Sequence, residues 1–172
     1  NKQELEEDKD TPIIGNPNAA ITVIEFFDYR CGYCKRVFSN MIKILRETSN
    51  VRFVLKELPI LGPDSVAASR ASLAVWRTHK EKYQAFHSAL LKTRGGIPEA
   101  KILSIASNLG INTNQLKKDI VAPEIDDILA KNQRLAQALN INGTPAFVIG
   151  NKLVPGALDL ATLRRLIASE GG

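Results

Sequence analysis

The chain of 172 residues contains only two cysteines and two histidines, so it has few side chains for a metal site. A closed structural zinc site takes four ligands, mostly from these two residue types. The histidines, His79 and His87, lie eight positions apart rather than at the spacing of a zinc finger. We therefore expect no structural zinc, although two thiolates alone could bind a soft ion such as Cu(I).

Long apolar runs and clustered basic residues are also missing. No stretch approaches the roughly 18 apolar residues that a membrane-spanning helix needs, so we expect no membrane span. The net charge is +5, but Lys and Arg are scattered and no aromatic stacking motif accompanies them. This pattern is typical of a solvated surface and argues against a nucleic-acid partner.

The N-terminal residues are charged rather than apolar. The first ten, "NKQELEEDKD", carry five acids and two lysines, and Leu5 is the only large aliphatic residue before Ile13. We expect residues 1–12 to be a charged segment that cannot drive strong oligomerisation, so this form is expected to be a monomer. A longer native N-terminus could still support an oligomer. Because the chain begins at Asn1 without a basic and apolar leader, we expect that a signal peptide has been removed from it.

The remaining length suits a single domain over residues 13–172. The β-branched and aromatic run "AITVIEFF" ends at residue 27 and predicts a buried strand. Apolar residues then recur at helical spacing over 32–47. Residues 51–59 predict a second strand that Pro59 ends. These three elements form a βαβ unit, with both cysteines where the first strand leads into the helix.

The second half of the chain is mainly helical. Residues 63–140 predict a series of helices, and "AFVIGNKLV" then predicts a β-hairpin with Gly150 and Asn151 at its turn. The segment "DLATLRRLIAS" predicts a last helix capped by Asp159. The order β-α-β, helices, β-β-α describes an α/β fold whose two halves are separated by a helical insertion at about 63–140.

Cys31 and Cys34 are spaced as a redox pair. A ring this small stabilises a fold by only about 2 kcal/mol before strain, so their disulfide should be easily reduced rather than structural. Cys31 lies at the start of the predicted helix, where the free N–H groups lower a thiol pKa. Arg30, Lys35 and Arg36 lie nearby and should act in the same direction. Cys34 is one turn inside the helix, so we expect it to be less accessible and to resolve the mixed disulfide.

The residues between and before the cysteines suggest further roles. Gly32 leaves the backbone open to a partner chain, and Tyr33 adds an uncharged aromatic surface. Glu25 lies six residues before Cys31 inside a buried strand, where burial should raise its pKa. We expect Glu25 to relay a proton to or from Cys34. Lys56, in the next strand, is a candidate charge partner for Glu25.

Several segments together resemble a known family. "VIEFFDYRCGYC", "KELPILGP", "NGTPAFVIG" and "LVPGA" resemble the DsbA-like branch of the thioredoxin superfamily, and most of all its bacterial envelope subgroup that includes ScsC-type proteins. The resemblance implies a thioredoxin fold with a helical insertion between the βαβ and ββα halves. It also implies that Pro145 is cis and faces the cysteines, and that the backbone of Thr144 pairs with an extended substrate. Glu25 and Lys56 match the family's buried acid and its usual neighbour.

The function implied is thiol–disulfide exchange without a bound cofactor. We expect an oxidase or isomerase that acts in the periplasm on unfolded or misfolded envelope proteins, together with a membrane redox partner. The motif "CGYC" with Thr before the cis-proline resembles isomerases and reductases as much as oxidases. Two other readings of the residues remain open: a peptide-binding holdase module, and a copper-handling thiol protein, each with non-catalytic cysteines.

Overall fold

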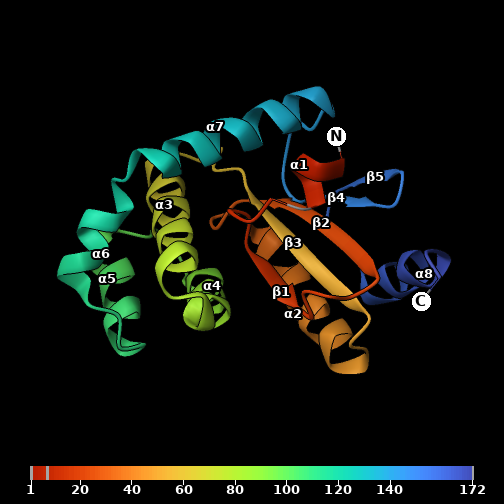
Figure 1. The fold of residues 1–172 in the computed structure, drawn as a ribbon, viewed down its shortest axis with the longest axis horizontal. Helices are drawn as coiled ribbons and strands as arrows, with labels where there is room; N and C mark the ends of the chain where they lie inside the picture. The colour runs from red at the N-terminus through yellow and green to blue at the C-terminus, as the bar shows by residue number, and fades with distance from the viewer. Residues whose placement is uncertain (1, 7, 172) are drawn as a thin grey trace.

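A five-stranded mixed sheet forms the centre of the protein in a computed structural model that describes residues 2–6 and 8–171 (Figure 1). The strands lie in the order β1-β3-β2-β4-β5. Only β2 and β3 pair in parallel, and the other neighbours are antiparallel. The strands are β1 (Ile13–Gly15), β2 (Ile21–Phe27), β3 (Val51–Glu57), β4 (Ala146–Ile149) and β5 (Lys152–Pro155).

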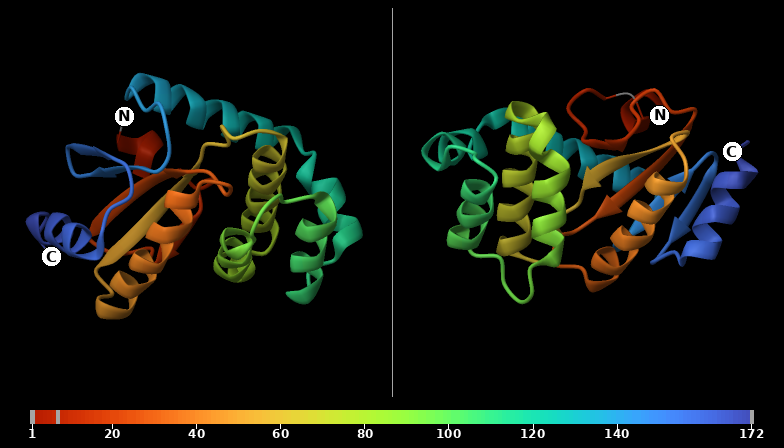
Figure 2. Two further views of the ribbon diagram at one scale, coloured as in Figure 1. Left: turned by 180° about the vertical axis from the view of Figure 1, so that it is seen from behind. Right: turned by 90° about the horizontal axis from the view of Figure 1, so that it is seen from below.

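Helix α2 (Gly32–Glu47) connects the two parallel strands, and α8 (Leu160–Ser169) closes the second half. Both lie on one side of the sheet (Figures 1 and 2). The βαβ unit, the hairpin and the last helix are therefore confirmed. Together with the helices between them they give the expected thioredoxin-like α/β fold.

The helical insertion forms a separate group of helices beside the sheet (Figure 2). Its elements are α3 (Pro63–Thr78), a short 3-10 turn (Lys80–Lys82), α4 (Tyr83–Lys92), α5 (Glu99–Asn108), α6 (Thr113–Ile120) and α7 (Pro123–Ala138). Helix α7 runs back from this group across the top of the sheet to the hairpin (Figure 1). The Asn132 side chain of α7 donates a hydrogen bond to the backbone oxygen of Glu57, at 3.0 Å, and so ties the insertion to β3.

The two faces of the sheet have different partners, because successive side chains of a strand point to opposite sides. Val23 and Leu55 belong to the main core, which α2, α8 and the inserted helices complete. Ile24 and Val54 face the other way, into a smaller apolar cluster. This alternation decides which of the predicted site residues can meet.

Two elements near the N-terminus were not expected. Strand β1 pairs antiparallel with β3, and α1 (Lys2–Glu6) lies close to β2. Leu5 is only 8% exposed and packs in the smaller apolar cluster, so part of the charged segment covers the sheet. No helix within the described ranges is long and apolar enough to cross a membrane.

Candidate functional site

Cys31 caps the N-terminus of α2. Its backbone is extended, with φ −73° and ψ 116°, and its sulfur accepts a hydrogen bond from the backbone N–H of Cys34 at 3.2 Å. Its own N–H donates to the backbone oxygen of Asp28 at 3.1 Å. Both cysteines are free thiols and both are buried, with 6% of Cys31 and 1% of Cys34 exposed. Cys31 is therefore the more accessible sulfur, as expected.

The two thiols have opposite acidities. Hydrogen bonding with the Cys34 side chain is the main cause that lowers the pKa of Cys31 to about 6. Hydrogen bonds from Thr144 and from the N–H groups of Tyr33 and Cys34 lower this pKa further, whereas burial raises it. Burial and the hydrogen bond with Cys31 raise the pKa of Cys34 far above its usual range, and the nearby Glu25 adds to this. One sulfur is thus an anion near neutral pH while the other holds its proton.

The basic side chains play a smaller part than we expected. Lys35 donates hydrogen bonds to the backbone oxygens of Leu91 and Thr93, at 3.0 and 2.7 Å, rather than to the sulfur. The guanidinium of Arg36 lies 4.4 Å from the centre of the Tyr33 ring. The main causes of the low pKa of Cys31 are hydrogen bonds at the helix start rather than these charges.

The proline loop faces the cysteines. The Thr144–Pro145 peptide bond is cis, as the resemblance implied. The thiol of Cys31 donates to the backbone oxygen of Thr144 at 3.4 Å. This carbonyl therefore lies within reach of the reacting sulfur.

The surface around Cys31 is open. A side chain at Gly32 would meet no atom within 4 Å, and Tyr33 is 58% exposed. Ile60 and Leu61, in the loop after β3, are also exposed apolar residues. A pocket of about 410 Å³ adjoins Pro145, with a lining formed by Asn140, Ile141, Asn142, Gly143, Thr144, Pro145, Ala146, Leu153, Pro155 and Gly156.

Asp28 holds three segments together at the site. Its Oδ1 accepts hydrogen bonds from Arg30 N and Ser65 Oγ at 2.8 and 2.7 Å. Its Oδ2 accepts from Ile60 N and Leu61 N at 2.8 and 3.0 Å. Sequence reasoning did not single out this buried residue. Its position directly after a buried strand and before the cysteines was the signal that could have done so.

Glu25 lies beneath the cysteines, as expected. It is 3% exposed, and its Oε2 has no hydrogen-bond partner among the residues that the structure describes. Burial is the main cause that raises its pKa well above the usual range, and the charges of Cys31 and Glu57 add to this. The carboxyl group is therefore held protonated close to the thiol pair.

The expected pairing of Glu25 with Lys56 is wrong. In the parallel register Glu25 is opposite Leu55, and Lys56 is opposite Phe26. Adjacent positions point to opposite faces, so the two side chains lie on different sides of the sheet. The amine of Lys56 instead donates to the backbone oxygen of Glu4 at 2.7 Å and to Thr11 Oγ1 at 2.9 Å. Burial lowers its pKa to about 8.

A buried polar network next to Glu25 was missed. Glu57 accepts a hydrogen bond from Ser69 Oγ at 2.6 Å, and the Tyr29 hydroxyl lies 2.6 Å from both Ser72 Oγ and His87 Nδ1. All five residues are completely buried. The strand pattern could have suggested Glu57, since it continues the alternation of the buried Phe53 and Leu55. Its partners come from distant helices.

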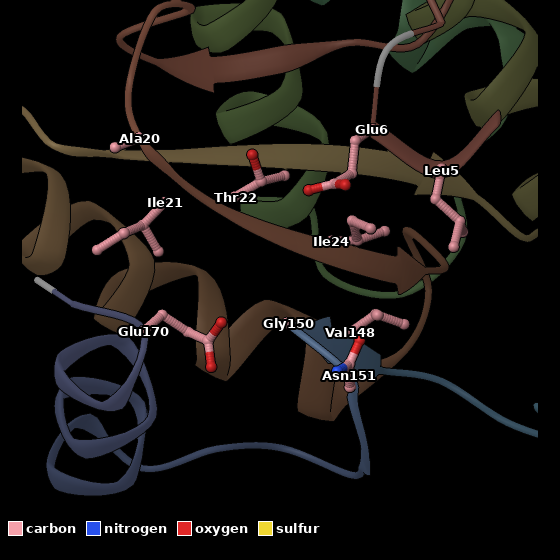
Figure 3. A pocket seen from close by; sticks show the side chains of 10 residues that line it. All are labelled: Leu5, Glu6, Ala20, Ile21, Thr22, Ile24, Val148, Gly150, Asn151 and Glu170. Atoms are coloured by element: carbon pink, nitrogen blue, oxygen red, sulfur yellow. The ribbon is translucent and has the colours of Figure 1, made fainter. Parts of the chain in front are cut away.

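A second pocket of about 410 Å³ lies at the amino end of β2, away from the cysteines. Figure 3 shows its lining side chains: Leu5, Glu6, Ala20, Ile21, Thr22, Ile24, Val148, Gly150, Asn151 and Glu170. They offer no thiol and no basic side chain, so this pocket has no part in the thiol chemistry. Within residues 2–6 and 8–171, no group of three His, Cys, Asp or Glu side chains could hold a metal ion.

A family model described as "DSBA-like thioredoxin domain" matches residues 22–168. The chain belongs to the DsbA-like family. This DsbA-like protein therefore carries its free Cys31 and Cys34 in a domain of disulfide oxidoreductases, and it is an enzyme of that class.

Solved structures similar to this DsbA-like protein cover nearly its whole length. A thioredoxin-like oxidoreductase from Silicibacter pomeroyi DSS-3 is 41% identical with a TM-score of 0.93, over 98% of this chain and 96% of that one. The catalytic domain of Proteus mirabilis ScsC is 31% identical with a TM-score of 0.90, over 98% and 93%. A periplasmic thioredoxin-like protein from Salmonella enterica serovar Typhimurium is 29% identical with a TM-score of 0.89, over 98% and 94%.

A curated relative shows the same family at lower identity. Disulfide bond formation protein D of Bacillus subtilis is 24% identical over 94% of this chain and 78% of its own length. These findings agree with the resemblance to DsbA-like and ScsC-type proteins that the sequence motifs carried.

Proposed function

We propose that this protein exchanges disulfides with substrate proteins of the bacterial envelope, with Cys31 as the sulfur that substrates attack and Cys34 as its resolving partner. The observation that carries the proposal is the set of contacts on Cys31. Its sulfur accepts the Cys34 N–H at 3.2 Å and lies 3.4 Å from Thr144 O. The Cys34 N–H stabilises the thiolate, which makes Cys31 both a nucleophile and a good leaving group. The Thr144 carbonyl lies within reach of the same sulfur.

The favoured direction is donation of the disulfide to a substrate dithiol. A substrate thiolate attacks Cys31 of the oxidised pair, so a substrate–Cys31 bond forms and the Cys31–Cys34 bond breaks. Cys34 leaves with the electron pair and takes up a proton. A second substrate thiolate then attacks the first substrate sulfur and releases Cys31 as a thiolate. The substrate is oxidised to a disulfide, and the enzyme pair is reduced.

The same sulfur could also act as an isomerase in the reduced form. In that case the Cys31 thiolate attacks a wrong substrate disulfide, and a substrate thiol later displaces it. The pKa of about 6 for Cys31 favours this second function as well. Both functions use the Cys31 sulfur, which is attacked in the first and attacks in the second. They differ in the redox state in which the enzyme meets its substrate.

Substrate recognition would use the open side of Cys31. The backbone of Thr144 could pair with an extended segment, as in strand addition, and the pocket beside Pro145 could take an apolar side chain. Gly32 would let the substrate backbone approach, and exposed Tyr33 would provide aromatic contact. These features suit unfolded chains better than one folded partner.

The envelope location is proposed from similarity. The similar protein from Salmonella, whose structure covers 98% of this chain, is periplasmic. The periplasm is also an oxidising compartment, in which protein disulfides form and persist. We propose that the enzyme works in the periplasm, and that a membrane protein restores its redox state after each turnover.

Alkylation rates test the assignment of the sulfurs. In the reduced protein Cys31 should react with iodoacetamide much faster than Cys34, and its rate should rise through a midpoint near pH 6. Cys31→Ser and Cys34→Ser identify each sulfur by mass spectrometry. Equal rates, or a faster Cys34, would refute the assignment.

Turnover on two substrates then tests the function. The oxidised enzyme should oxidise a reduced, unfolded protein, and the reduced enzyme is tested on a scrambled one. Cys31→Ser should abolish both activities. If the Cys31→Ser variant still prevents aggregation of the substrate as well as the unaltered protein does, while the unaltered protein exchanges no disulfides, the holdase reading is correct instead.

A further inference from the structure

Two buried acids share one face of the sheet under the cysteines. Glu25 of β2 is opposite Leu55 of β3, and Glu57 follows Leu55 by two residues, so both carboxyl groups point toward the main core. Glu25 is 3% exposed and Glu57 is fully buried. Each has an Oε2 atom without a hydrogen-bond partner in the described part of the chain.

No basic side chain balances this pair. In the described ranges neither carboxyl group takes part in a salt bridge, and Lys56 lies on the opposite face. The titratable groups that face the pair are Asp28 and Tyr29 from the loop after β2, Tyr83 and His87 from α4, and the two cysteines at α2.

These neighbours bring no positive charge near neutral pH. Burial lowers the pKa of His87 to about 3, so its ring is neutral. Burial also raises the pKa of Tyr29 and of Tyr83, so both hydroxyls keep their protons. Two carboxylates in such a site cannot both ionise readily, because each charge disfavours the other. The pair therefore carries at most one negative charge over the neutral range.

The two acids differ in the hydrogen bonds that could stabilise a negative charge on their carboxyl groups. Glu57 accepts a hydrogen bond from Ser69 at 2.6 Å, and the hydroxyls of Ser72 and Tyr29 also favour its ionised form. Against these, burial is the largest cause that raises its pKa to about 8, and Asp28 adds to the rise. No hydrogen bond lowers the pKa of Glu25, which burial raises well above its usual range. Glu57 is thus the first of the two to lose its proton.

We propose that Glu57 is a positioning residue for the thiol chemistry: as pH rises it takes the first negative charge of the buried pair, so that Glu25 keeps the proton that Cys34 needs. The inference rests on the disulfide exchange proposed above. It assigns to Glu25 the role of acid in the step that reduces the enzyme pair.

A substrate thiolate forms a bond to Cys31, the Cys31–Cys34 bond breaks, and its electron pair goes to Cys34. The carboxyl group of Glu25 gives its proton to the Cys34 sulfur and becomes a carboxylate. Near neutral pH Glu57 is still largely protonated, because its pKa is about 8, so the pair then carries one charge. Cys34 holds a proton more strongly than Glu25, because burial and the neighbouring groups raise its pKa far above the usual range of a thiol. Glu57 extends the pH range in which Glu25 still has a proton to give.

A titration of the two carboxyl groups tests the proposal without relying on activity. The side-chain carboxyl carbons of glutamate are labelled with ¹³C, and their NMR shifts are followed with pH in the reduced protein and in Glu57→Gln. Glu57 should titrate at lower pH than Glu25. In Glu57→Gln the midpoint of Glu25 should fall by roughly one pH unit, since a buried like charge has been removed.

Two further variants give the matched comparisons. Ser69→Ala removes the 2.6 Å hydrogen bond to Glu57, so it should raise the midpoint of Glu57 and lower that of Glu25 by less than Glu57→Gln does. Glu99→Gln, at an exposed acid of α5, should change neither midpoint. An unchanged Glu25 midpoint in Glu57→Gln, or a Glu25 that ionises before Glu57, would overturn the proposal.

Kinetics give a second readout. In single-turnover reduction of the oxidised enzyme by a small thiol, the decline of the rate at alkaline pH should begin at lower pH in Glu57→Gln. If the enzyme exchanges no disulfides, this experiment fails for every variant, whereas the NMR titration still decides whether Glu57 controls Glu25. A kinetic profile that does not move although the NMR midpoint does would also reject the assigned acid step.

Discussion

The acidity of Cys31 comes from its place in the backbone more than from the charges near it in the sequence. The sulfur caps α2 and meets the Cys34 N–H at 3.2 Å, while Lys35 donates both of its short hydrogen bonds to backbone oxygens at the end of α4. A cation that is close in sequence can therefore have little effect on the thiol pKa, because its side chain binds other groups. The capping position, by contrast, follows directly from where the helix begins.

Glu25→Gln should make the fold more stable as pH rises. The raised pKa of Glu25 means that the unfolded chain loses this proton near pH 4.5 while the folded protein keeps it, so the wild type loses stability above that pH. The amide has no such proton to lose. Thermal melts from pH 5 to 8 should therefore show a growing advantage for Glu25→Gln, and none for Glu99→Gln.

The same variant should slow the release of Cys34, because an amide cannot supply the proton. General acids contribute roughly a hundredfold or more when they act in the rate-limiting step, so a loss up to about that size is expected in single-turnover rates. Rates equal to those of the wild type near neutral pH would leave Glu25 with a structural role only.

At the level of elements, Lys35 connects the helix that carries the cysteines with the helical insertion. Its amine reaches Leu91 O and Thr93 O, where the C-terminal carbonyls of α4 lack partners within the helix. This contact fixes how α4 lies against α2. It also puts the charge of Lys35 at the negative end of the α4 dipole, where a cation is favourable.

Lys35→Met should therefore cost about 1.5–3 kcal/mol of stability, the range for hydrogen bonds to a charged group. It should change the alkylation midpoint of Cys31 little. Lys43→Met, at an exposed position of the same helix, is the matched control and should be close to neutral in urea unfolding. A large upward shift of the Cys31 midpoint in Lys35→Met would restore the role first expected for the basic side chains.

Much of the element order could be read from the sequence, and the reason is local. Helix α2 was expected at 32–47 and forms there, because apolar spacing and the start of the helix are properties of neighbouring residues. Strand β1 was missed, because three residues at an edge give almost no periodic signal. The pairing of Glu25 with Lys56 failed for another reason: only the register of β2 and β3 reveals that their side chains point to opposite faces.

At the scale of the whole molecule, the redox state and the stability of the fold are linked through pH. A folded-state pKa of about 6 for Cys31, against 9.0 for an ordinary cysteine, stabilises the reduced protein when the sulfur is ionised. This contribution is complete above pH 9, declines between about 9 and 6, and is lost as pH falls through the folded value. The uncharged disulfide form has no such dependence, and its ring contributes only about 2 kcal/mol before strain.

Melting temperatures of the two forms should therefore converge and then cross with rising pH. The reduced form should gain on the oxidised form from pH 6 to 9, and the difference should be flat below pH 6. Cys31→Ser should melt without this rise, as its hydroxyl does not ionise. An oxidised form that stays clearly the more stable up to pH 9 would favour a reductase over a disulfide donor.

The contact between Cys31 and Thr144 spans 113 positions of the chain, and this distance has a consequence for biosynthesis. While the polypeptide is being synthesised, Cys31 emerges long before the carbonyl that it will face. The hydrogen bonds that Asp28 accepts from Ile60, Leu61 and Ser65 likewise form only after those residues have been made. The hydrogen bonds that lower the pKa of Cys31 within α2 can form early, whereas the proline loop that faces the sulfur is complete only after residue 145 has been made.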